Sequence, residues 1–291
     1  MPRNLIDDLV DASPNRRSFL KKIGAATAAV GALSLAGAST AEAQSTTEVQ
    51  VLNFALNLEY LEAEFYTYGL FGTSITSFGI GINGQANGPN PTTGGTTIGG
   101  SQVTFSNNLI FSHDIAAEIG SDERAHVVLL RSALGSAAVA KPNLNLNALG
   151  FGFGNQNDFL KLSRIFEDIG VTAYAGAAGL LSTPSVITTA ARILATEAEH
   201  VSTVRTQIAR LNIATAALDG ADLVPPPTGP TTQYLSINVS NGLVATRTPG
   251  QVLYLAYGGQ AGVSQGGFFP DGVNGAITMS STPATASNLA T

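Results

Sequence analysis

The sequence predicts an all-α protein built around a four-helix bundle. Four segments carry apolar residues at helical spacing, and residues that cap or end helices bound each of them. Two segments contain the phrase Glu-x-x-His-Val-x-x-x-Arg, at Glu123–Arg131 and Glu197–Arg205. The other two share the phrase Glu-x6-Tyr, at Glu59–Tyr66 and Glu167–Tyr174. Because the two phrases alternate along the chain, we expect two helix hairpins of one plan, packed as a bundle over residues 44–215.

The first helix should begin at a cap on Thr46 or Thr47 and run to about Tyr68, where Gly69 ends it. The chain that follows, 69–104, is rich in Gly, Asn and Thr. This composition is too polar for a core and too long for an ordinary connection. We therefore expect a mobile or functional insertion between the first and second helices, with its glycine pairs as flexible chain.

The second helix should begin near Ser106 or Ser112 and end at Leu134, because Gly135 stands at the position where glycine stops helices. A loop with Gly and Pro then leads to the third helix.

A cap on Asn157 or Asp158 predicts a third helix that reaches about Leu181. Thr183 followed by Pro184 is the order of an N-cap and a first helical residue, so a fourth helix is expected to about residue 211.

Residues 216–291 should form a mostly irregular extension. It includes a stiff Pro-rich linker at 225–230 and an alternating stretch at 234–244 that indicates one or two short strands. The run Thr248–Gln251 has the residues of a capping box and predicts a short helix through Tyr257.

Residues 1–43 have the order of an export signal. Arg16–Lys21 resembles a twin-arginine signature, a mildly apolar stretch at 23–38 follows, and Ala41–Ala43 is a small-x-small cleavage site. The apolar stretch is short for a permanent span. We therefore expect an exported protein, periplasmic or extracellular, with no stable membrane span after processing.

Composition limits which partners and which metal-ligand atoms the chain can use. The formal net charge is −6, so the chain has no general basic footprint and no nucleic-acid partner is expected. Cysteine is absent, which excludes disulfides and thiolate ligands. Any metal must be bound through oxygen and nitrogen, the donors that iron and manganese accept.

The repeated phrases predict where that metal binds. Residues at i and i+3 share a helix face, so each Glu-x-x-His presents a carboxylate beside an imidazole. A dinuclear site in a bundle needs one further glutamate from each remaining helix. Glu167 fills one place, and Glu59 is preferred to Glu62 because only Glu59 belongs to the repeated Glu-x6-Tyr phrase. Six ligands to two divalent ions, iron or manganese, are thus expected: Glu59, Glu123, His126, Glu167, Glu197 and His200.

Three further residues should surround these ligands. Tyr66 and Tyr174 each lie two turns beyond a ligand glutamate on the same face, and Glu62 lies one turn beyond Glu59. Arg131 and Arg205 lie off the His face, so they should pair with acids at the bundle surface or ends.

This pattern resembles the ferritin-like superfamily. More narrowly, the chain is similar to bacterial ferritin-like proteins related to plant desiccation-related proteins, at residues 52–62, 166–174, 247–253 and 267–275. The resemblance implies a ferritin-like fold with iron or manganese, and it implies no particular reaction.

Two hypotheses follow. The first is a dinuclear metal protein that acts on oxygen or peroxide, or handles metal, in stress defence. The second is a non-catalytic desiccation-related scaffold with a vestigial or structural metal site. Both leave a homo-oligomer open.

Overall fold

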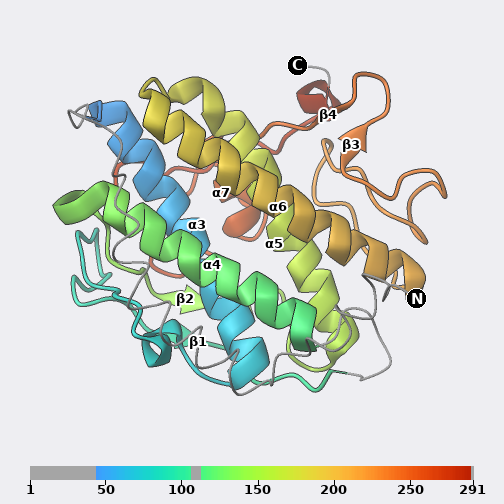
Figure 1. The fold of residues 1–291 in the computed structure, drawn as a ribbon, viewed down its shortest axis with the longest axis horizontal. Helices are drawn as coiled ribbons and strands as arrows, with labels where there is room; N and C mark the ends of the chain where they lie inside the picture. The colour runs from blue at the N-terminus through green and yellow to red at the C-terminus, as the bar shows by residue number, and fades with distance from the viewer. Residues whose placement is uncertain (1–43, 106–112, 290–291) are drawn as a thin grey trace, which may run out of the picture. The chain divides into compact units, whose positions relative to one another are not determined.

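Four long helices lie side by side in the computed structural model, which describes residues 44–105 and 113–289 (Figure 1). They are α3 (Thr46–Phe71), α4 (His113–Leu134), α5 (Gln156–Ala177) and α6 (Pro184–Arg210). α3 packs chiefly against α4, and α5 against α6, so the predicted bundle of two hairpins is confirmed. The predicted signal at 1–43 and the starts predicted near 106 or 112 lie outside the described residues. Among the described helices, none is both long and apolar enough to cross a bilayer.

α3 begins at a capping box. The Ser45 hydroxyl accepts from the backbone N–H of Glu48, whose carboxylate accepts from the backbone N–H of Ser45 in return. The prediction that Gly69 ends this helix is wrong, since the helix continues to a left-handed Gly72 with φ 66°. Gly69 is there for packing: a Cβ on it would come within 3.0 Å of the Phe159 ring of α5.

The ends of α4 and α6 agree with the sequence. α4 ends at Leu134, and Gly135 follows with φ 55°, a conformation that favours glycine. Pro184 opens α6 as predicted. Thr183 precedes it but makes no side-chain cap; its hydroxyl instead donates to the carboxylate of Glu48, 2.8 Å away. The start of α6 is thereby fixed to the start of α3.

α5 is shifted from its predicted bounds. Its N-cap is Asn155, whose Oδ1 accepts from the backbone N–H of Asp158 at 3.0 Å, so Asp158 lies inside the first turn rather than at the cap. The helix ends at Ala177, earlier than predicted, because the backbone tightens into the 3₁₀ turn η4 (Ala178–Leu180).

The insertion 69–104 forms a hydrogen-bonded layer. It contains the 3₁₀ turn η2 (Ile75–Phe78) and the strand β1 (Thr97–Ile98), which pairs in parallel with β2 (Leu144–Asn145) after α4. A Cβ on Gly95 would come within 3.0 Å of the backbone at Pro142 and Asn143. The expectation of flexible glycine pairs is therefore wrong, because Gly95 permits close packing against the chain after α4.

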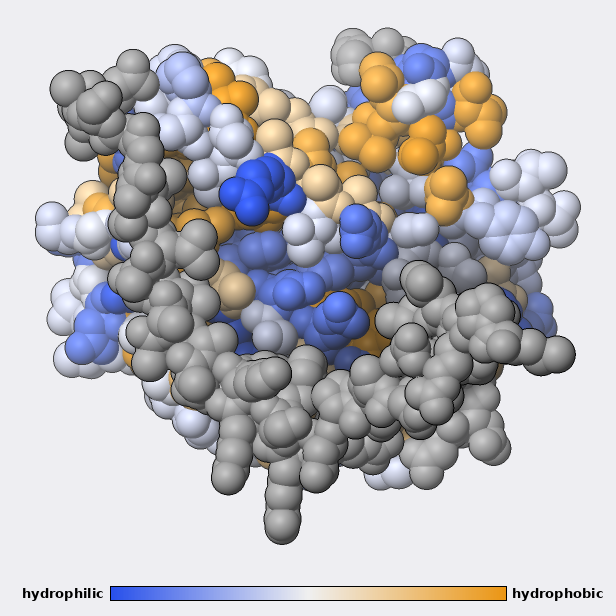
Figure 2. All heavy atoms as spheres, in the orientation of Figure 1, coloured by the Kyte–Doolittle hydropathy of each residue, from blue (hydrophilic) through white to orange (hydrophobic). Residues whose placement is uncertain are grey.

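The extension adds a hairpin and a short helix. β3 (Ile237–Asn238) pairs antiparallel with β4 (Leu243–Val244), and α7 (Pro249–Ala256) begins at the predicted capping box and packs on α5. Figure 2 shows hydrophobic residues gathered where this hairpin lies. Val239, at its turn, is 80% exposed. The extension thus covers α5 on one side and presents apolar side chains on the other.

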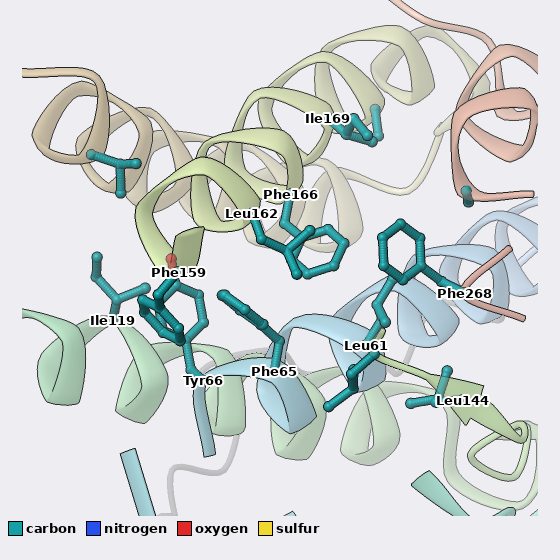
Figure 3. Packing of buried hydrophobic residues seen from close by; sticks show 14 of the residues in the cluster. Leu61, Phe65, Tyr66, Ile119, Leu144, Phe159, Leu162, Phe166, Ile169 and Phe268 are labelled. Carbon is teal, nitrogen blue, oxygen red and sulfur yellow. The ribbon is translucent and has the colours of Figure 1, made fainter. Parts of the chain in front are cut away.

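The bundle core is aromatic. Phe65 of α3 stacks on Phe159 of α5 with ring centroids 4.4 Å apart, and Phe166 packs edge-on against Phe268 of the extension at 5.0 Å (Figure 3). Tyr66 belongs to the same cluster. Such pairs add to the stabilisation from burial alone. The core therefore anchors the residues next to Tyr66 and Glu167 on rigid helices.

Candidate metal centre

The six predicted ligands meet in the interior of the bundle, and each of them is at most 7% exposed. Their ligand atoms form two groups of four in which all atoms lie within 4.8 Å of one another. The first group is Glu59, Glu123, His126 and Glu197, and the second is Glu123, Glu167, Glu197 and His200. The groups share the two glutamates of the Glu-x-x-His phrases. Each group also has one histidine and one glutamate that the other group lacks.

Both imidazoles turn the same nitrogen toward the carboxylates. Nδ1 of His126 lies 3.2 Å from Glu59 Oε2 and 3.4 Å from Glu123 Oε2. Nδ1 of His200 lies 3.0 Å from Glu123 Oε1 and 3.2 Å from Glu167 Oε2. The ring centroids are 6.4 Å apart. The two rings therefore flank Glu123 from opposite sides.

The tyrosines bond across the bundle. Tyr174 of α5 donates its hydroxyl to Oε1 of Glu59 on α3 at 2.5 Å, and Tyr66 of α3 donates to Oε1 of Glu167 on α5. The sequence placed each tyrosine two turns beyond the glutamate of its own helix. The structure adds that each hydroxyl reaches the glutamate of the opposite helix. Each outer glutamate thus keeps one oxygen for a ligand while the other is held.

Several buried polar atoms of the cluster make no regular hydrogen bond to the described residues, although His200 Nδ1 lies close to carboxylate oxygens of Glu123 and Glu167. They include both carboxylate oxygens of Glu123, both of Glu197, Oε2 of Glu167 and Nδ1 of His200. A buried carboxylate without a partner costs free energy, so native proteins pair such groups or use them to coordinate metals. These atoms all belong to the two groups of four. Their chemistry, oxygen and imidazole nitrogen, fits iron or manganese.

The buried carboxyl and imidazole groups of the cluster have strongly shifted pKa values. Burial raises the pKa of Glu59 to about 7, and burial together with the charge of Glu123 raises the pKa of Glu197 well above its usual range. Burial favours neutral imidazole, but the surrounding carboxylates raise the pKa of His126 and His200 far above the usual value. In the metal-free cluster, bound protons therefore neutralise part of the carboxylate charge, and metal cations would displace these protons.

Glu62 lies beside the groups and belongs to neither. It is buried, and burial together with the charge of Glu197 raises its pKa well above the usual range. Facing it is Gly170, which follows Glu167 by the same spacing at which Glu62 follows Glu59. A Cβ on Gly170 would lie 3.5 Å from Glu62 Oε1 and under 3.0 Å from Glu197 Oε2. Gly170 therefore leaves room for the shared carboxylate of Glu197.

A small, mostly apolar pocket between α3 and α5 is lined in part by Glu59 and Glu62. Its other walls include Leu58, Gly170 and Tyr174.

Asp122 precedes Glu123 on α4 and contacts a histidine of the cluster. Its Oδ2 lies 3.2 Å from Nε2 of His200, the ring nitrogen that faces away from the cluster. Asp122 is on α4 and His200 on α6, and the aspartate is partly exposed. A carboxylate at this place orients the ring and fixes its tautomer.

The arginines depart from their predicted surface pairing. Arg205 is fully buried, and its Nη1 donates to both oxygens of Asp168, the closer at 2.8 Å. Arg164 contacts the same carboxylate at 2.6 Å. Arg131 pairs with no acid among the described residues; it donates to the Tyr60 hydroxyl at 2.5 Å. The predicted acid partner is therefore confirmed for Arg205, but its surface position is wrong, because the extension covers the face on which it lies. For Arg131 the predicted acid partner is wrong.

Residues 47–210 match the ferritin-like domain family, and this stretch is more than half of the chain. The chain belongs to that family. It is also similar to a desiccation-related protein of Craterostigma plantagineum, with 29% identity over 175 residues. The similarity covers 54% of this chain and 52% of the relative, so the chain spans about half the length of that relative.

Proposed function

We propose that this chain is an exported ferritin-like protein that holds two divalent ions, iron or manganese, and acts on oxygen or peroxide or handles metal in stress defence. One observation carries the proposal: two buried groups of four carboxylate and imidazole ligands share Glu123 and Glu197. Four carboxylates bring four negative charges, and two divalent ions offset them.

The ligand roles follow from this sharing. Glu59 and His126 would hold one ion, Glu167 and His200 the other, and Glu123 and Glu197 both. Bound ions would supply Lewis acidity and, where they are redox-active, electrons for reduction of oxygen or peroxide.

The chain's own residues prepare the site. Tyr66 and Tyr174 hold Glu167 and Glu59 in place through their hydroxyls. The aromatic core packs α3 against α5 beside Tyr66 and Glu167, and a small pocket between the same two helices borders Glu59 and Glu62. These contacts orient the ligands before any ion binds, which is what a preformed site requires.

Loading tests the metal proposal. The folded full chain, freed of metal and dialysed against Fe²⁺ or Mn²⁺, should hold two ions. The double variant Glu123→Ala/Glu197→Ala should hold none, because it removes the ligands common to both groups. Glu199→Gln, an exposed acid on α6, is the matched control and should hold two. A wild-type chain with less than one ion overturns the proposal.

A second candidate is a non-catalytic scaffold for stress protection. Its support is the name of the Craterostigma plantagineum relative, which refers to desiccation. The loaded protein separates the two: oxidation of ferrous iron or consumption of peroxide supports the first proposal, and a loaded protein that does neither supports the scaffold.

Export is proposed from residues 1–43 alone. Replacing Arg16 and Arg17 with lysine should leave the protein inside the cell, as cell fractionation would measure. Unchanged export of this variant would contradict a twin-arginine signal.

A further inference from the structure

We infer that the two metal positions are inequivalent, and that Asp122 makes the position of Glu167 and His200 the tighter one. The inference rests on the proposed function, since it concerns how the two ions would be held. It comes from a break in the repeated arrangement on the outer side of the two histidines.

The nearest contacts of the two positions match. Each has one glutamate of its own, and that glutamate accepts from a tyrosine of the opposite helix. Each has one histidine whose Nδ1 faces the shared carboxylates. These groups alone give no reason for one position to bind more tightly than the other.

The break lies one residue before each shared glutamate. Asp122 precedes Glu123, whereas Thr196 precedes Glu197. Across the bundle, Asp122 Oδ2 is 3.2 Å from Nε2 of His200. Thr196 makes no equivalent bond, because its hydroxyl donates to the backbone oxygen of Arg192 at 3.2 Å.

His126 therefore lacks the support that His200 has. Within 44–105 and 113–289, the structure shows no hydrogen bond to Nε2 of His126, although the ring is as deeply buried as that of His200. The equivalent place on α6 is occupied by a threonine that is already bonded to its own helix.

A carboxylate on the outer nitrogen changes the inner one. It keeps the proton on Nε2, leaves the Nδ1 lone pair free for a metal, and makes that nitrogen more basic. Loss of such a partner typically lowers metal affinity by about 10- to 100-fold. The Asp122 side chain is 43% exposed, and solvent screens its charge, so we expect the lower end, about 10-fold.

The experiment is a calorimetric titration of the metal-free full chain with Mn²⁺. Wild type should bind two ions in two steps of different affinity. Asp122→Asn should weaken the tighter step about 10-fold and leave the other step unchanged. Glu199→Gln removes an exposed charge next to His200 and should change neither step.

A reciprocal variant tests the same effect at the other metal position. Thr196→Asp places a carboxylate opposite His126 and should tighten the weaker step. Single-histidine variants assign the steps: the ion that remains in His126→Ala should be sensitive to Asp122→Asn, and the ion that remains in His200→Ala should not.

Two ions of equal affinity in wild type, or equal weakening of both steps by Asp122→Asn, would overturn the inference while the proposed function stands. A wild-type chain that binds no Mn²⁺ or Fe²⁺ would overturn the proposed function itself.

Discussion

Replacing Gly170 with alanine should separate folding from metal binding. Gly170 lies within α5, and a Cβ there would come under 3.0 Å from Oε2 of Glu197, closer than real Cβ atoms come. Ordinary contact begins at 3.4 Å, so the oxygen must retreat by about 1 Å. That is about five times the ±0.2 Å within which metal–ligand distances hold.

The effect on folding should be small. Alanine is favoured over glycine inside a helix by about 0.8–1 kcal/mol, and the atom that must move is the end of a side chain. The unfolding free energy of the metal-free protein should therefore change by less than about 1 kcal/mol, which is a shift of about 2–4 °C or less. Metal affinity should fall at least about 10-fold in both steps, because Glu197 belongs to both groups.

Thermal unfolding and calorimetric titration with Mn²⁺ measure the two effects on one sample. Gly179→Ala is the matched control, since nothing lies within 4 Å of the added Cβ in the turn after α5. It should bind as wild type does. If Gly170→Ala binds two ions with wild-type affinity, Glu197 does not need its observed place and the reasoning fails.

Three further substitutions test the packing around the site. Glu48→Gln should lower the unfolding temperature at neutral pH, because backbone N–H donors lower the pKa of Glu48 to about 2. The stability that ionised Glu48 contributes is complete above the ordinary pKa of 4.5 and is lost as the pH falls through 2. The difference in unfolding free energy between wild type and variant, measured by urea titration, should therefore shrink over that pH range. A difference that grows as the pH falls would contradict this reasoning. Arg205→Met leaves Asp168 with one arginine fewer and should cost about 3 kcal/mol by urea unfolding; a loss under about 1 kcal/mol would refute a structural role. Gly69→Ala pushes a methyl group into an aromatic ring of α5 and should destabilise by about 1–3 kcal/mol, whereas a more stable variant would show that the helices can separate.

The repeated phrases made the bundle and its cluster of buried glutamates and histidines predictable. Periodicity places each phrase on a helix, and two copies of each phrase indicate which glutamates converge. The choice of Glu59 over Glu62 came from repetition alone, and in the structure Glu59 is the one whose oxygen joins a group of four.

What the sequence did not predict concerns contacts between residues far apart in the chain. Gly69 has the local properties of a helix stop, and only the Phe159 ring shows why glycine stands there. Arg205 lies off the His face, but the extension buries it through backbone oxygens such as that of Leu223. Asp122 is offset from the ligand face of its own helix, so its bond to His200 depends on how α4 and α6 are spaced. No periodicity encodes these distances.

The most direct test of the account is to locate the ions. Crystals of the full chain grown with Mn²⁺ should show two anomalous peaks inside the bundle. One peak should touch His126 and the other His200, with Glu123 and Glu197 reaching both. Peaks only at the surface, or none among these residues in protein that has been given excess metal, would contradict a dinuclear centre.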